Sequence, residues 1–239
     1  MHFKGIITNF AFYLSNHSEM KRIAFLLLTI FSGLTSYAQI PELYHHKNGT
    51  QLLIGGEPFI ILGGELANSS ASSEEYMDSR NTWSYLSQSG LNTVLAPVYW
   101  ELIEPKQDRF DFSSVDYLLR SARENNLKLV LLWFGTWKNS MSCYVPSWVK
   151  QGFGRDFDLA RNSDGNVPEI LSAFSERNVQ ADAKAFSMLM KYLKKADGQE
   201  GTVIMVQVEN EIGMLGDARD HGQLADNAYR SPVPYEVIY

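Results

Sequence analysis

Residues 202–213 read TVIMVQVENEIG and form the most informative stretch of the chain. The first seven of them are mostly apolar and rich in valine, which predicts a buried β-strand. The strand runs directly into Glu209, Asn210 and Glu211, although an ionised carboxylate is costly to bury without a partner. We therefore expect these charges to serve a functional site at the end of the strand.

Other segments also predict strands that are almost wholly apolar. They are LKLVLLWF, residues 127–134, and LNTVLAPVYW, residues 91–100. Residues 51–66 predict a β-hairpin around a Gly-Gly-Glu-Pro turn. Its second arm, residues 59–62, ends at Gly-Gly-Glu, residues 63–65.

Segments with an apolar face at helical spacing separate these strands. They predict helices over residues 82–89, 115–125 and 181–195. Apolar strands that alternate with helices indicate a parallel sheet covered on both faces. Two architectures have such a sheet, the open doubly wound fold and the (β/α)8 or TIM barrel.

The ends of the strands distinguish these two architectures. An open nucleotide-binding sheet usually carries a G-x-G-x-x-G turn after its first strand, whereas Gly63 and Gly64 lead here to Glu65. Each strand ends instead in polar or aromatic residues, at Glu65 and at residues 99–101, 134–137 and 209–211. In a (β/α)8 barrel the active site is built at these carboxyl ends. The predicted fold class is therefore α/β, a (β/α)8 TIM barrel.

The length of the chain limits how much of this barrel it can hold. A (β/α)8 barrel takes about 250 residues, and only about the first four β/α units can be identified before Tyr239. We therefore expect residues 39–239 to form the N-terminal half of a longer barrel domain.

The N-terminal residues have the pattern of an export signal. A basic pair and an apolar run of about 12 residues precede a small-x-small site at Ala38, and roughly 20 apolar residues are needed to span a bilayer. We expect residues 20–38 to be a signal peptide, which makes the mature protein periplasmic or extracellular, without a membrane segment. Residues 1–19 are then an upstream extension, if Met20 rather than Met1 is the true start.

The composition excludes several classes of function. The chain has 239 residues, of which 45% are hydrophobic, and a formal net charge of -6, which suits a globular protein and argues against a nucleic-acid partner. Its single cysteine, Cys143, rules out an intrachain disulfide framework. The five histidines lack ligand spacing, so we expect no metal and no cofactor. The oligomeric state is not indicated.

The Glu-Asn-Glu motif suits the acid-base chemistry of glycosidic bond cleavage. That reaction usually takes two carboxyl groups, one of which must hold a proton near neutral pH. Glu211 is the better candidate for this acid because it lies past the strand end, and Asn210 can bond a sugar hydroxyl. For the motif in isolation, a glutamate that caps the following helix is an equally good interpretation.

Side chains at the other strand ends are candidate sugar contacts. An indole can cover the C–H face of a pyranose and donate its N–H to a hydroxyl, which makes Trp100 and Trp137 candidates. Packing in the core or at the rim is the alternative for both. Glu65 is a candidate hydroxyl acceptor, with a salt bridge across the barrel mouth as the alternative.

Together these segments resemble the glycoside hydrolases of clan A, and family 35 in particular. QVENEIG, residues 207–213, is similar to the acid/base motif that ends the fourth barrel strand. Residues 90–133 are similar to the second and third β/α units, and VPSWVK, residues 145–150, matches the LPAWL segment of the family. The resemblance runs from about residue 51 to the end and implies a β-galactosidase-like enzyme with a carbohydrate substrate.

The resemblance also assigns roles by position. It makes Glu211 the proton donor and Asn210 the contact to the 2-hydroxyl, while the family's nucleophile, a late glutamate, has no counterpart here. FGTWKNSMSC, residues 134–143, replaces a Cys-Ala-Glu-Trp stretch whose glutamate grips galactose, and GGELANSS, residues 63–70, replaces SG-x-x-H-Y. These departures point to a divergent branch with family 42 character and leave the galactose selectivity open.

The resulting hypothesis is an exported, retaining glycoside hydrolase acting on terminal β-galactosides of oligosaccharides or polysaccharide side chains, in a chain truncated before the nucleophile. The alternatives are a non-catalytic fragment with at most weak sugar binding, or a clan A glycosidase of other sugar specificity. A parallel half-barrel leaves apolar edge strands unpaired. We therefore expect the 239 residues alone to be inactive and poorly soluble.

Overall fold

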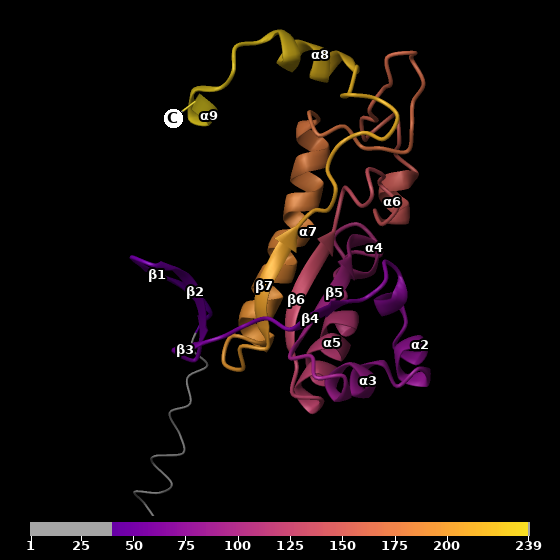
Figure 1. The fold of residues 1–239 in the computed structure, drawn as a ribbon. Coiled ribbons are helices and arrows are strands. Elements are labelled where there is room, and N and C mark those ends of the chain that lie inside the picture. Colours follow the sequence, from indigo (N-terminus) through magenta and orange to yellow (C-terminus); the bar gives the residue numbers. More distant parts are fainter. Residues whose placement is uncertain (1–39, 239) are drawn as a thin grey trace, which may run out of the picture. The chain divides into compact units, whose positions relative to one another are not determined.

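A computed structural model of the chain describes residues 40–238, so the expectations for residues 1–19 and 20–38 lie outside the described residues. The main feature is a parallel sheet in the strand order β4-β5-β6-β7 (Figure 1). Its strands are β4 (Gly63–Glu65), β5 (Thr93–Tyr99), β6 (Lys128–Phe134) and β7 (Val203–Val208). Each strand pairs with the next one in the sequence, as consecutive β/α units do, and the predicted parallel sheet is confirmed.

Helices occupy each connection of this sheet. They are η1 (Ser70–Ser72), α2 (Glu74–Ser79) and α3 (Thr82–Gln88) before β5; α4 (Trp100–Ile103) and α5 (Ser113–Glu124) before β6; α6 (Ser147–Lys150) and α7 (Glu176–Ala196) before β7; and α8 (Gln223–Arg230) and α9 (Tyr235–Ile238) after it. The helices predicted from periodicity correspond to α3, α5 and α7. Among residues 40–238, none of the helices is long and apolar enough to cross a membrane.

Helix α7 begins at Glu176, earlier than the predicted residue 181. Its first turns contain Asn178 and Asp182, which are buried although they are polar. Asn178 donates through Nδ2 to the backbone oxygen atoms of Asp158 and Ser172, at 2.8 and 2.9 Å. These buried polar residues interrupt the apolar periodicity from which a helix is predicted.

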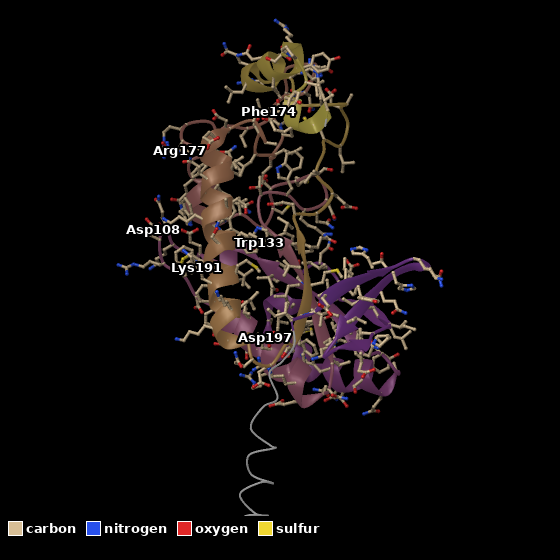
Figure 2. All side chains as sticks on the ribbon, turned by 90° about the vertical axis from the view of Figure 1, so that its left-hand side faces the viewer. Asp108, Trp133, Phe174, Arg177, Lys191 and Asp197 are labelled. Carbon is tan, nitrogen blue, oxygen red and sulfur yellow. The ribbon has the colours of Figure 1, made fainter. Side chains whose placement is uncertain are left out.

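The register of the sheet decides which side chains share a face. Residues in register on parallel strands project to the same side, and successive residues alternate. Tyr99 pairs with Phe134, and both lie on the face opposite to that of Trp133, here called the inner face. Trp133 lies on the outer face, beside α7 (Figure 2), where its indole N–H donates to Asp182 at 2.8 Å.

The two middle strands, β5 and β6, carry the core, while β7 is only partly covered. Leu129, Leu131 and Trp133 of β6 are fully buried against the helices. In contrast, Met205 and Val208 of β7 are 45% and 60% exposed. Within residues 40–238, β4 and β7 are the edge strands of the parallel sheet.

A small antiparallel sheet precedes the parallel one and corrects part of the hairpin prediction. It consists of β1 (Glu42–His46), β2 (Gly49–Ile54) and β3 (Glu57–Pro58). The predicted turn is present, but the arm expected at residues 59–62 is not a strand. Proline has no N–H to continue the ladder, and the chain leaves the hairpin after the Phe59 N–H donates to the Leu52 oxygen at 2.8 Å.

Candidate functional site

Two carboxyl groups from different elements meet at the carboxyl end of β7. Asp182 of α7 accepts hydrogen bonds from the Trp133 indole at 2.8 Å, the Thr136 N–H at 2.6 Å and the Thr136 hydroxyl at 2.5 Å. Glu209 accepts from the same Thr136 N–H at 3.1 Å and from the Trp137 N–H at 2.7 Å. This pair joins α7, the loop after β6 and the end of β7.

One proton is shared within this pair at neutral pH. Burial, followed by the neighbouring Asp182, raises the pKa of Glu209 to about 10. Two adjacent carboxyl groups do not both ionise readily. Because the pKa of Glu209 is raised far above neutral pH, Glu209 holds the proton.

Asn210, a predicted sugar contact, is partly buried and faces the loop after β6. Its Oδ1 accepts a hydrogen bond from Lys138 Nζ at 2.7 Å. The Lys138 ammonium also lies 4.7 Å from the centroid of the Phe134 ring, within the range of a cation–π interaction. Lys138 could not be recognised as a site residue from the sequence, because a lone lysine in a loop has no spacing pattern.

Glu211, the predicted proton donor, is exposed at the surface of the same region. Its backbone oxygen accepts a hydrogen bond from Ser140 Oγ at 3.2 Å. Both Glu209 and Glu211 have left-handed backbone angles, with φ of 61° and 50°. Such angles cost non-glycine residues free energy and are concentrated at functional sites.

An aromatic cluster lies beside this motif on the inner face of the sheet. The Tyr99 ring centroid lies 5.9 Å from that of Phe134 and 5.0 Å from that of Tyr144. Burial raises the pKa of Tyr99. The Tyr144 hydroxyl is 2.7 Å from Ser69 Oγ, which joins the cluster to the segment after β4.

Trp137 is almost fully buried and forms part of the wall of a cavity of about 560 Å³. Phe174, Phe186 and Val208 give the cavity a largely apolar lining, to which Glu209 adds a carboxyl group. The structure therefore brings Trp137 next to the Glu-Asn-Glu motif. Its contact with a sugar remains a prediction.

The structure places Trp100 in the core instead of the site. Its side chain is fully buried, and its indole N–H donates to Glu104 Oε2 at 3.0 Å. Tyr99 ends the strand on the inner face, and the next residue projects away from it. Trp100 therefore has no ring face open to a sugar. Glu65 ends β4 in register with Leu95 and is exposed on the inner face.

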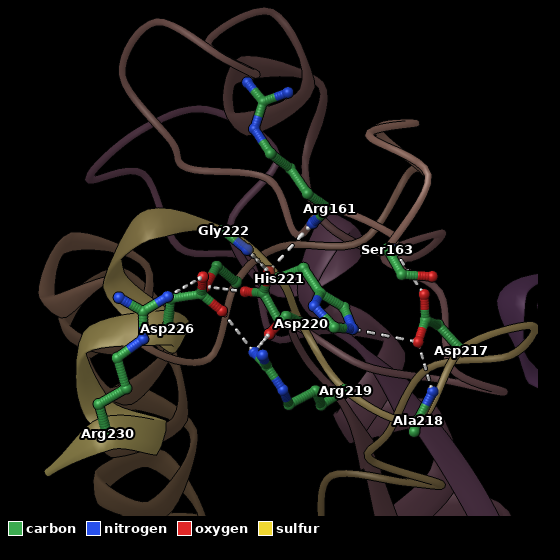
Figure 3. A network of polar contacts seen from close by, with 11 residues as sticks. Arg161, Ser163, Asp217, Ala218, Arg219, Asp220, His221, Gly222, Asp226 and Arg230 are labelled. Atoms are coloured by element: carbon green, nitrogen blue, oxygen red, sulfur yellow. Dashed lines mark hydrogen bonds and ion pairs between the residues drawn. The ribbon is translucent and has the colours of Figure 1, made fainter.

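A polar network holds the segment that follows the motif (Figure 3). The buried Asp220 carboxylate accepts hydrogen bonds from the Arg161 N–H at 3.0 Å, the Gly222 N–H at 2.6 Å and the Ser172 hydroxyl at 2.6 Å. Hydrogen bonds from Ser163 lower the pKa of Asp217. The network ties residues 217–222 to the long loop before α7.

The residues that the structure describes offer no cluster suited to a metal ion. Within residues 40–238, no group of three or more His, Cys, Asp or Glu side chains is arranged to hold a metal.

The fold is similar to that of solved β-galactosidases. A catalytic mutant of a family 42 β-galactosidase from G. stearothermophilus matches with a TM-score of 0.53 and 20% identity over 71% of this chain and 23% of its own. The β-galactosidase from Bacillus circulans sp. alkalophilus matches with a TM-score of 0.52 and 16% identity, over 69% and 22% of the two chains. The predicted fold class is confirmed: the sheet is part of a (β/α) barrel.

Three curated proteins are related in sequence. A β-galactosidase from Xanthomonas manihotis is 30% identical over 86% of this chain and 32% of its own length. β-Galactosidase 13 from Arabidopsis thaliana is 28% identical over 84% and 24%. A β-1,2-glucosyltransferase from Ignavibacterium album is 24% identical over 77% and 27%. The chain thus spans between about a quarter and a third of the length of these relatives.

The family assignment rests on a match that covers most of the chain. The sequence profile described as Glycosyl hydrolases family 35 matches residues 51–238. This range begins within β2 and includes all four strands of the parallel sheet. Together with the structural likeness to β-galactosidases, including one of family 42, it is consistent with a divergent clan A branch. The chain belongs to glycoside hydrolase family 35.

Proposed function

We propose that the full-length protein is a retaining exo-β-galactosidase in which Glu211 is the acid/base. The observation that carries this proposal is the position of the Asn210-Glu211 pair. It follows β7 and Glu209 at the carboxyl end of a parallel barrel sheet, in a chain of family 35. Barrel enzymes build their active sites at this end. Asn210 then contacts the 2-hydroxyl of the sugar.

In this mechanism Glu211 first protonates the oxygen of the leaving group and later removes a proton from the attacking water. Its exposure gives a substrate access to the carboxyl group. A retaining enzyme also needs a carboxylate nucleophile about 5 to 5.5 Å from the acid. We propose that this second carboxylate lies beyond the 239 residues, because the matched relatives are several times longer.

Galactose is the proposed glycone because two of the relatives are named β-galactosidases. The glucosyltransferase name of the third relative makes a glucosyl glycone the alternative. Galactose and glucose differ only in the configuration at C4. Aryl β-galactosides and aryl β-glucosides with the same leaving group therefore distinguish the two directly, by the ratio of their kcat/KM values.

The experiment that tests the acid/base assignment is Glu211→Gln in the full-length protein. General-acid catalysis contributes about 10²–10⁴-fold, and a poor leaving group depends on it most. We expect kcat/KM to fall by about 10²–10⁴-fold for a natural galactoside and by much less for an activated aryl galactoside. Wild-type cleavage of the natural galactoside by this variant would show that another residue is the acid.

Export of the protein is part of the same proposal. It is supported by the basic pair, the apolar run and the small-x-small site within residues 20–38. An oligosaccharide or a polysaccharide side chain outside the cytoplasm suits an enzyme that removes terminal sugars. Cell fractionation, followed by N-terminal sequencing of the mature protein, would locate the enzyme and show whether cleavage follows Ala38.

A further inference from the structure

Lys138 begins a tight turn that restricts its backbone. Its N–H donates to the Met141 oxygen at 2.8 Å, and the Met141 N–H donates back to the Lys138 oxygen at 3.0 Å. The two residues between them, Asn139 and Ser140, have φ of 52° and 56°. Positive φ at both central positions is what a two-residue type I′ turn requires. The Lys138 side chain therefore leaves a backbone with little conformational freedom.

The Lys138 side chain is also buried, with an exposure of 7%. Among residues 40–238, no acidic side chain forms an ion pair with it within 4.0 Å. Its contacts are the Phe134 ring and the Oδ1 atom of Asn210, at 4.7 and 2.7 Å. Because burying an ammonium group is costly, the charge-assisted hydrogen bond to Asn210 is strongly favoured.

This bond determines how the Asn210 amide is turned. A lysine ammonium has three donors and no acceptor, whereas an asparagine side chain has one oxygen acceptor and one NH₂ donor group. Only the oxygen of Asn210 can therefore face Lys138. The NH₂ group is directed away from Lys138 and is left to bond another acceptor.

We propose that Lys138 is a positioning residue that fixes Asn210 as a hydrogen-bond donor to the 2-hydroxyl oxygen of the sugar. The proposal rests on the role given to Asn210 above and extends it to a residue of the divergent loop. The same turn holds the backbone of Glu211 through Ser140 Oγ, at 3.2 Å. One turn after β6 thus orients both the amide and the main chain of the acid.

The test measures how much the 2-hydroxyl contributes to catalysis in the full-length protein. The measurement is the ratio of kcat/KM for an aryl β-galactoside to that for its 2-deoxy analogue. Because contacts to this hydroxyl strengthen in the transition state, we expect Lys138→Met to lower the ratio about 10-fold or more, mainly through kcat. Lys138→Arg, which again offers only donors, should restore most of it.

Lys128→Met is the matched control. Lys128 lies at the other end of β6, and its Nζ donates to the Gly201 backbone oxygen at 2.8 Å. Its loss removes a comparable lysine-to-oxygen bond, so it should reduce stability without changing the 2-hydroxyl ratio. An unchanged ratio in Lys138→Met, with a collapsed ratio in Asn210→Ala, would overturn the proposal.

The proposed function and the positioning role can fail separately. Glucosides carry the same equatorial 2-hydroxyl, so the ratio can be measured with glucosides if the enzyme prefers them. If neither sugar is cleaved, the proposed function fails, and a crystal structure of Lys138→Met still decides the inference. A rotated Asn210 amide supports it, and an amide that keeps its wild-type orientation overturns it.

Discussion

Asp182 and Glu209 accept hydrogen bonds from one and the same backbone N–H, that of Thr136, at 2.6 and 3.1 Å. One carboxyl group belongs to α7 and the other follows β7, so the N–H joins two elements that are distant in sequence. Such a pair holds one proton at neutral pH, because two adjacent carboxyl groups do not both ionise readily. Its titration therefore affects stability.

The first prediction concerns the pH dependence of stability. The pKa of Glu209 is raised from 4.5 to about 10, so its contribution to stability is fully present below about pH 4.5 and is lost as the pH rises towards 10. Glu209→Gln should reduce this decline by up to about 1.4 kcal/mol per pH unit. Urea unfolding of wild type and variant at about pH 5, 7 and 9 measures the two slopes.

Asp182→Asn is the matched variant for the same pair. An amide at position 182 directs donors towards donors, and it should cost about 1–3 kcal/mol for each group left unsatisfied. Glu209→Gln keeps one oxygen for the Trp137 N–H and can turn its NH₂ group towards Asp182, which still accepts from the Thr136 N–H, so it should be the milder change at neutral pH. The reverse order of stabilities would contradict the assignment of the proton to Glu209.

The second prediction is that Gly135 tolerates no side chain. A Cβ atom there would lie 2.3 Å from Trp133 Nε1 and 2.5 Å from Asp182 Oδ2. Gly135→Ala should therefore break the bond between them and cost about 3 kcal/mol, because overpacking and a lost buried hydrogen bond add up. Gly154→Ala is the control: its φ is +71° and its Cβ meets nothing within 4 Å, so only the backbone cost of about 1–2 kcal/mol is expected. Equal losses of unfolding free energy would contradict this account.

The third prediction separates the two tryptophans that were predicted to bind sugar. Trp100→Phe removes a hydrogen bond to the buried Glu104 and should cost about 1–3 kcal/mol of stability without changing KM. Trp137→Phe, next to the Glu-Asn-Glu motif, should raise KM if Trp137 contacts the sugar. Thermal unfolding and Michaelis–Menten kinetics of both variants provide the comparison. A raised KM in Trp100→Phe with unchanged stability would return Trp100 to the site.

The fourth prediction concerns the exposed edge strand β7. We expect residues 39–239, expressed alone, to lack galactosidase activity and to associate as their concentration rises, because Met205 and Val208 expose apolar surface on an edge strand. Met205→Lys should reduce this association, as measured by light scattering. Gln207→Lys, which adds the same charge without removing an apolar side chain, is the control. A soluble, monomeric and active product would contradict the prediction.

The sequence predicted the strands and helices that have a regular pattern of apolar residues. Strands β5 and β6 are apolar throughout, and α5 has a regular apolar face, so their existence follows from periodicity alone. Glu65 and Glu209, which were predicted at strand ends, lie at the carboxyl edge of the parallel sheet. The face on which a strand-end side chain lies was predicted less well. Trp100 is one residue past Tyr99 and projects into the core.

The carboxyl pair and Lys138 were not predictable in the same way. Asp182 lies within α7 and Glu209 after β7, and no spacing rule relates them because the contact depends on how the helix packs against Trp133. Lys138 meets Asn210 only because residues 138–141 form a tight turn. Such contacts between distant segments are properties of the fold.

The anchoring of the loop after β6 has a consequence for which substitutions this protein can accept. Glu209 holds residues 136 and 137 through their main-chain N–H groups, and every amino acid except proline supplies such a group. The side chain of Trp137 is therefore not needed for this attachment. The buried Trp137 ring packs with Ala160 and Ile170, so a library of large apolar and aromatic residues at position 137 should keep the loop in place while it varies the wall of the cavity.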